Sequence, residues 1–156
     1  MPFTHLNEKG EAIMVDVTGK AVTHRTAIAS GRISMSAECY QAVKEGSAKK
    51  GDVLGVARVA GIMATKRTAD LIPLCHVLAL TKCAVDFTLE DESHSITARC
   101  TVQCEGKTGV EMEALTGVST ALLTVYDMCK AMDKRMVISD IHLCEKQGGK
   151  SGDFVF

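Results

Sequence analysis

Asp127 and Lys130 lie three residues apart inside a helical pattern that covers 109–132. Side chains at this spacing meet on the surface of a helix, so the carboxylate and the ammonium can pair. The pair is either an ordinary surface ion pair or a proton-transfer pair, because its surroundings can tune a lysine and an aspartate toward neutral pH. The sequence leaves both interpretations open.

Three further residues could take part in chemistry, and each also has a plain structural interpretation. Lys50, just before a helix, is either a solvated charge or a base that loses its proton at a closed interface. His76 is either a core or turn histidine or a general acid–base group. Arg25, flanked by threonines on a strand, is either an edge charge or a phosphate clamp.

Two short stretches, GKT at 106–108 and GKS at 149–151, resemble the end of a P-loop. A complete P-loop has an earlier glycine that lets the backbone curl around phosphate, and here that position falls on Thr101 and on Cys144. A Walker-type nucleotide site is therefore excluded. A looser anion-binding loop remains open, because glycine-rich backbone and lysine still attract phosphate.

The start of the long helix carries acidic residues. Thr108 and Glu111 fit a capping box, and Glu113 adds negative charge where the helix dipole favours it. Capping alone is enough to account for both carboxylates. They remain candidates for a site only in combination with other residues.

Composition describes an ordinary globular domain. The 156 residues are 46% hydrophobic and 24% charged, with a net charge of −1. The chain has no Trp, two Tyr and four Phe, so a nucleic-acid partner is not expected. The N-terminal stretch lacks the apolar segment of a signal peptide and no window is long enough to span a membrane, so we expect a cytoplasmic protein without a membrane partner.

The seven cysteines do not suggest a metal site or a disulfide framework. Their number is odd, no Cys-x-x-Cys occurs, and the spacing of Cys100 and Cys104 is not that of a zinc finger. We therefore expect reduced thiols that mostly fill the core, and no bound metal.

Hydrophobic patterning predicts a single α+β domain over 1–156. Polar segments form a loosely ordered arm at 1–20 and a flexible loop at 148–156. Strands are predicted at 21–36, 78–90, 94–104 and 135–147, and helices at 36–46, 51–70 and 109–132. This order favours a ferredoxin-like fold, with helices packed on one face of an antiparallel sheet.

Several motifs together resemble the MoaC family of cyclic pyranopterin monophosphate synthases. The resemblance covers almost the whole chain in order, and its most specific stretches are DLIPLCH and KTGVEMEALT followed by YDMCKA. The other matching stretches are MVDVTGKAVTHRTA, KKGDVLGVARVAGIMATKRTA, LTKCAVDF and GGKSGDF. Val77 departs from the proline that many relatives have after the histidine, which could shift that loop but removes no reactive group.

The resemblance implies a lyase of molybdenum cofactor biosynthesis. Its substrate would be a cyclised GTP, (8S)-3′,8-cyclo-7,8-dihydroguanosine 5′-triphosphate, which is rearranged to cyclic pyranopterin monophosphate with release of pyrophosphate. The resemblance also implies a hexamer built as a trimer of dimers, with sites between subunits. No cofactor is required, although a divalent cation such as Mg²⁺ would be compatible with the phosphates.

The resemblance also assigns residues. It implies that Lys50, Asp127 and Lys130 are catalytic. Substrate-contacting positions fall on Leu74, Cys75, His76, Met112 and Glu113, with Glu111 and Arg25 as further polar residues of the pocket. On charge we add Lys66 to Arg25 and His76 as groups for the triphosphate.

Two other functions remain consistent with the sequence. A ferredoxin-like module could bind a nucleotide or a partner without turnover, in which case changes at Lys50 or Lys130 would matter little. A thiol or metal protein could use Cys75 and His76, in which case the purified protein would carry stoichiometric metal.

Overall fold

The computed structural model describes residues 3–48 and 51–156. Its elements in chain order are β1 (Thr23–Ser34), α1 (Ala37–Glu45), α2 (Val53–Thr65), α3 (Thr68–Leu71), β2 (Leu80–Glu90), β3 (Ser95–Gly106), α4 (Glu111–Cys129), β4 (Val137–Gln147) and β5 (Phe154–Val155). Within these two ranges no helix is long and apolar enough to cross a membrane.

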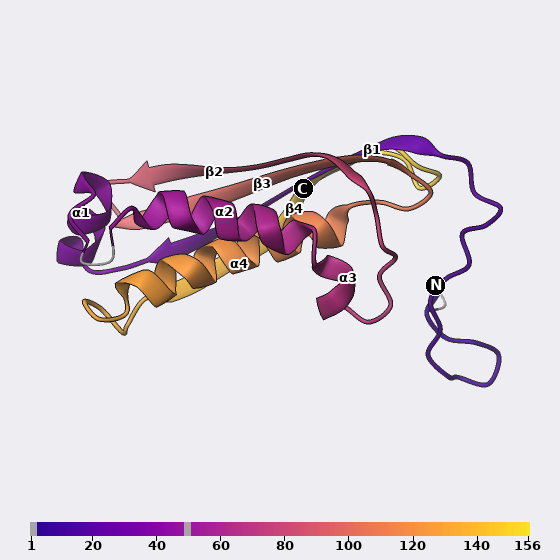
Figure 1. The fold of residues 1–156 in the computed structure, drawn as a ribbon, viewed down its shortest axis with the longest axis horizontal. Coiled ribbons are helices and arrows are strands. Elements are labelled where there is room, and N and C mark those ends of the chain that lie inside the picture. Colours follow the sequence, from indigo (N-terminus) through magenta and orange to yellow (C-terminus); the bar gives the residue numbers. More distant parts are fainter. Residues whose placement is uncertain (1–2, 49–50) are drawn as a thin grey trace.

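The sheet is antiparallel, with the strand order β2-β3-β1-β4-β5. Figure 1 shows α2 and α4 side by side over one face of this sheet. Two helical crossovers place β1 and β3 in the middle, with β2 and β4 outside them. This arrangement confirms the predicted ferredoxin-like α+β fold.

Local sequence signals set the ends of the first two long helices. Ser36 caps α1, because its hydroxyl accepts a hydrogen bond from the Cys39 amide, and Gly46 ends it in the left-handed region at φ 71°. Asp52 caps α2 by accepting from the Gly55 amide at 2.9 Å.

The core lies between the helices and the sheet. On α4 an apolar stripe faces this core: Val118, Leu122, Val125 and Cys129 are fully buried, and Leu115 packs against them. The two long helices approach closely at two glycines, since a Cβ on Gly61 would lie 3.0 Å from the Gly117 carbonyl oxygen.

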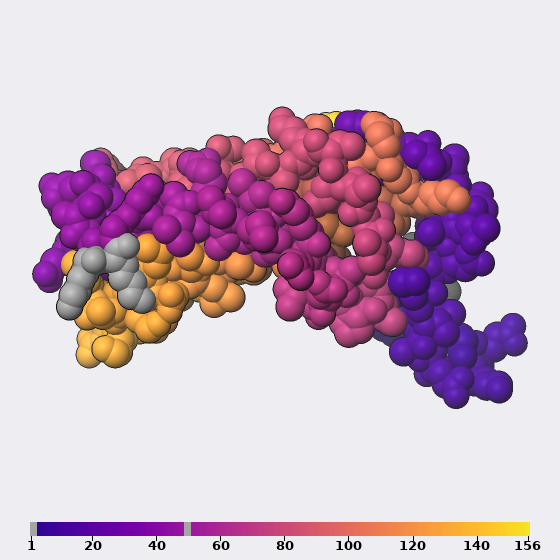
Figure 2. All heavy atoms as spheres, viewed as in Figure 1, coloured from indigo at the N-terminus to yellow at the C-terminus, as the bar shows by residue number. Residues whose placement is uncertain are grey.

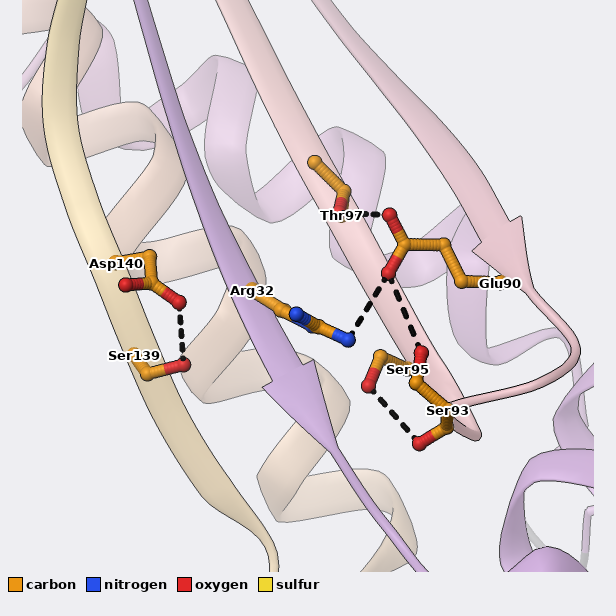
Figure 3. A network of polar contacts seen from close by, with 7 residues as sticks. All are labelled: Arg32, Glu90, Ser93, Ser95, Thr97, Ser139 and Asp140. Atoms are coloured by element: carbon orange, nitrogen blue, oxygen red, sulfur yellow. Dashed lines mark hydrogen bonds and ion pairs between the residues drawn. The ribbon is translucent and has the colours of Figure 1, made fainter.

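The other face of the sheet is polar. Gly31 faces α4, so Arg32, the next residue on β1, points to the opposite face. There the Arg32 guanidinium pairs with Glu90 at 3.2 Å, and Glu90 accepts hydrogen bonds from Ser93 and Thr97 (Figure 3). A sheet with one packed and one polar face is typical of antiparallel folds.

Three local predictions differ from the structure. The helix predicted over 51–70 is divided, because α2 ends at Thr65 and a short α3 follows. The capping box at Thr108 is wrong: the N-cap of α4 is Val110, with no capping side chain. Part of the predicted C-terminal loop, Phe154–Val155, pairs with β4 as the short strand β5.

Candidate active site

A cavity of about 280 Å³ lies where the N-terminal arm meets the loop before β2 and the start of α4. We call it the arm pocket. In Figure 2 the indigo arm lies against that loop at one end of the molecule. The lining residues are Thr4, His5, Val15, Val17, Lys20, Leu74, Cys75, His76, Leu78, Thr108, Gly109, Glu111, Met112 and Glu113. The structure thus brings together six of the residues that the sequence proposes for substrate.

His76 links the loop to the arm. Its Nε2 lies 2.6 Å from the Val15 carbonyl oxygen, which can only accept, so Nε2 carries a hydrogen and donates. In the neutral ring Nδ1 is then the acceptor, and it can take a proton from a bound molecule. The contact explains the position of the histidine and leaves one nitrogen for chemistry.

Glu113 is the buried acid of the arm pocket, with only 4% of its surface exposed. Burial raises the pKa of its carboxyl from 4.5 to about 7, and the charge of nearby Glu111 adds to the effect. Burial and the Glu113 charge likewise raise the pKa of the Cys75 thiol. Near neutral pH Glu113 can therefore donate or accept a proton, which a capping role alone would not provide.

Replacing Glu113 by Gln should remove a pH dependence of stability. Between pH 4.5 and about 7 the folded protein binds the Glu113 proton and the unfolded chain loses it, so stability falls as pH rises through this window. Across this pH range the free energy of unfolding of the wild type should fall by about 3 kcal/mol because of Glu113. The Glu113→Gln variant should not show this fall. Denaturant unfolding at pH 4 to 8 measures it. Glu38→Gln, exposed in the first turn of α1, is the control and should follow the wild type.

A second cavity, of about 410 Å³, adjoins the arm pocket and shares Lys20, Thr108, Gly109 and Glu111 with it. We call it the basic pocket, because Arg25, Lys146 and Lys150 complete its lining together with Ser151. Lys146 pairs with Glu111 at 3.6 Å and also donates to the Ser151 hydroxyl. Four cations around one cavity make it suitable for a polyanion.

The glycine-rich loop after β4 holds Arg25 in place. Arg25 is buried, and its Nε donates to the Gly106 carbonyl oxygen at 3.4 Å. Gly149 adopts φ +87°, and a Cβ there would collide with the Arg25 guanidinium. A Cβ on Gly148 would likewise collide with the His24 carbonyl oxygen. The loop that resembles a P-loop therefore supports an arginine.

Two of the proposed catalytic residues, Asp127 and Lys130, lie elsewhere. Lys130 donates to Asp127, and both side chains are about half exposed at the end of α4. Met112 and Asp127 are fifteen residues apart on this helix, which corresponds to about 22 Å. Lys50 lies outside the described residues. Lys66 lines a third cavity, which meets the arm pocket only at Leu78.

The structure adds residues that sequence reasoning did not single out as substrate groups. Lys20, Lys146 and Lys150 come from the arm, β4 and the C-terminal loop, and meet only in three dimensions. Only Lys150 had a local signal, in its glycine-rich GGKSG context. In the described part of the chain no three His, Cys, Asp or Glu side chains gather in a way that could hold a metal ion.

Comparison with known proteins gives a consistent result. The MoaC family profile matches residues 14–149. A cyclic pyranopterin monophosphate synthase of Clostridium botulinum is 58% identical over 153 residues, which cover 98% of this chain and 96% of the relative. Proteins of the same name from Clostridium perfringens and Heliobacterium modesticaldum are each 58% identical over 154 residues, which cover 99% of this chain and 98% and 97% of those relatives.

Proposed function

Because the chain belongs to the MoaC family, we propose that it converts (8S)-3′,8-cyclo-7,8-dihydroguanosine 5′-triphosphate to cyclic pyranopterin monophosphate and releases pyrophosphate. The observation that carries this proposal is the joining of the arm pocket to the basic pocket. An acid–base cavity beside a four-cation cavity suits a molecule with a ring system at one end and a triphosphate at the other.

The phosphates occupy the basic pocket in this proposal. Arg25 and Lys150 bind their oxygens, and Lys146 can exchange its contact with Glu111 for a phosphate. Loss of pyrophosphate leaves negative charge on the departing group, which these cations stabilise. Lys66, in a separate cavity, is the least suited of the residues first proposed for this role.

The ring system occupies the arm pocket, where Glu113 and His76 provide proton donors and acceptors. Leu74 and Met112 supply apolar surface, and Cys75 lies beside Glu113. The rearrangement opens a ring and moves protons between carbon, nitrogen and oxygen. Groups that change charge near neutral pH are suited to these steps.

A second copy of the chain completes the site. The separation of about 22 Å along α4 keeps Asp127 and Lys130 away from the arm pocket of the same chain. Exposed apolar side chains on the outer face of α2, at Val56, Val59 and Met63, are surface that a second copy can cover. We therefore propose a homo-oligomer, a hexamer built as a trimer of dimers, in the cytoplasm.

The proposed reaction needs no redox cofactor, because it rearranges and cyclises its substrate without net oxidation. A divalent cation such as Mg²⁺ can accompany the phosphates without being fixed by a protein carboxylate cage. Removal of divalent ions with a chelator should therefore slow the reaction without abolishing it.

The direct test supplies the cyclised GTP to the purified protein and follows pyrophosphate and pterin product together. Production of both supports the proposal. Tight substrate binding by folded protein without product would instead support the non-catalytic module. Stoichiometric metal in the protein, with loss of function after chelation, would support the thiol or metal protein.

Replacing Gly149 by Ala should weaken substrate binding through Arg25. The added methyl group collides with the guanidinium, so Arg25 cannot keep its present position in the lining of the basic pocket. We expect KM for the cyclised GTP to rise at least about tenfold, the usual effect of losing a hydrogen bond to a charged group. Steady-state kinetics measures it.

Gly152→Ala is the matched control for this change. Gly152 also has a positive φ, +76°, but nothing lies within 4 Å of an added Cβ. Both variants therefore carry the same kind of backbone strain, and only Gly149→Ala displaces Arg25. Equal KM values for the two variants would contradict the role of the loop.

A further inference from the structure

Cys83 is a thiol in the lining of a cavity that the proposed function does not use. The cavity is about 360 Å³ in volume and is lined by Ile62, Lys66, Leu78, Leu80, Thr81, Lys82 and Cys83. It lies at the outer strand β2, where the pairing with β3 shifts between Leu80 and Lys82. Two lysines and one partly exposed thiol therefore line the same space.

A second thiol lies directly behind the first. Cys100 on β3 is fully buried and is a diagonal neighbour of Cys83 across the paired strands, and the Thr65 hydroxyl of α2 donates to the Cys83 sulfur at 3.4 Å. The Cys83 thiolate can thus be stabilised by Cys100 and Thr65 from inside the protein and by Lys66 from the cavity. Thiolates are the nucleophilic form of cysteine, and such surroundings favour them.

The acid–base properties agree with this geometry. The hydrogen bond from Cys100 lowers the pKa of the Cys83 thiol from 9.0 to about 6; Thr65 and the charge of Lys66 act in the same direction, against burial. The same contact, burial and the charge of Asp86 raise the pKa of Cys100, which therefore remains the proton donor.

The other cysteines lack this combination. Cys39, Cys104 and Cys129 are fully buried, and burial raises the pKa of each. Cys75 is partly exposed, but burial and the Glu113 charge raise its pKa. Cys144 is partly exposed on β4, and the lining of the Cys83 cavity does not include it.

We propose that Cys83 is a covalent modification site, at which small anionic disulfides enter the cavity between Lys66 and Lys82 and form a mixed disulfide. The Cys83 thiolate attacks one sulfur, a new S–S bond forms, and the S–S bond of the reagent breaks. The leaving thiolate carries away the negative charge that Cys83 brought, and the disulfide itself is the oxidant.

Cys100 does not convert the adduct to an internal disulfide. Cys83 pairs with Val102 and Cys100 with Val85, so the two cysteines are diagonal neighbours across the strands. Diagonal Cα atoms lie about 7–8 Å apart, at or beyond the reach of a disulfide without backbone movement. The adduct on Cys83 is therefore the stable product.

The expected rate follows from the thiolate fraction and the nucleophilicity. At pH 6 a thiol of pKa about 6 is roughly 500-fold more ionised than one of pKa 9, and its lower basicity makes it about 20-fold less nucleophilic. Cys83 should therefore react about 25-fold faster than an ordinary thiol at pH 6. By the same arithmetic the advantage disappears at about pH 8, and at pH 9 Cys83 should react more slowly than an ordinary thiol.

The test reacts the native protein at pH 6 with the dianionic disulfide 5,5′-dithiobis(2-nitrobenzoate), following thiol release and locating the adduct by peptide mass spectrometry. We expect one fast phase on Cys83 that Cys83→Ser abolishes and Cys144→Ser retains. A fast adduct at another cysteine, an internal disulfide, or no fast phase would overturn the proposal.

Two further experiments test the groups that surround Cys83. Lys66→Met and Lys82→Met should slow the anionic reagent several-fold and have less effect on the cationic disulfide cystamine. Cys100→Ala should move the fast phase toward higher pH and raise the rate at pH 9, because the more basic thiolate is the stronger nucleophile there, which loss of folding would not do. Equal charge sensitivity for both reagents would overturn the assignment to an anion.

Discussion

Lys130→Met should lower kcat for pyrophosphate release by about a hundredfold or more, with folding intact. Lys130 is half exposed and follows the last turn of α4, so its side chain is not part of the core. Loss of a group that transfers a proton in the transition state costs about 10² to 10⁴ in rate. Single-turnover kinetics on cyclised GTP separates this effect from a change in substrate binding.

Lys44→Met is the matched control, because Lys44 also pairs with an aspartate near the end of a helix. Its exposed fraction is 44% against 49% for Lys130, and its partner Asp91 is 66% exposed against 60% for Asp127. Loss of an exposed ion pair costs at most about 1 kcal/mol of stability, so the control should keep full activity. A Lys130→Met enzyme as active as the control would reject the catalytic role and leave family membership untouched.

Leu122→Ala should destabilise the protein by about 2–5 kcal/mol, because it opens a cavity in the core. Leu122 is fully buried on α4. Its Cδ1 packs against Gly31 of β1, only 2.8 Å from the position that a Cβ on this glycine would occupy. Denaturant unfolding followed by circular dichroism measures the change.

Leu123→Ala is the control on the next residue of the same helix. Leu123 is 59% exposed, so the substitution has the same helix propensity cost and removes little buried surface. Both variants must be compared at one protein concentration, because association with other copies changes apparent stability. If Leu123→Ala lowered the stability as much as Leu122→Ala, the face of α4 that carries Leu123 would be buried in an assembly.

Mixing two variants tests whether one active site takes residues from two chains. If a second copy supplies Asp127 and Lys130 to an arm pocket, a mixture of Lys130→Met and Glu113→Gln chains contains sites with both groups intact. Neither variant alone contains such a site. Activity recovered on mixing and reassembly would support shared sites, and no recovery would contradict them.

The elements of the fold follow from local patterns in the sequence. Alternating and helical periods place four strands and the long helices, and the caps Ser36 and Asp52 fix where α1 and α2 begin. The signal fails where tertiary contacts decide. Glu111 lies at the right spacing for a capping box, but its carboxylate pairs with Lys146 on β4 and does not cap the helix with Thr108.

By itself the sequence determined the ferredoxin-like fold, the family resemblance and the set of polar residues worth testing. Only the tertiary structure decided which of these residues share a cavity, because the arm, the loop before β2 and the start of α4 are distant in the chain. It also revealed Lys20, Lys146 and Lys150 around Arg25, and the thiol pair of Cys83 and Cys100. Burial and proximity set the chemistry of these groups, and both arise from packing between segments that no local pattern connects.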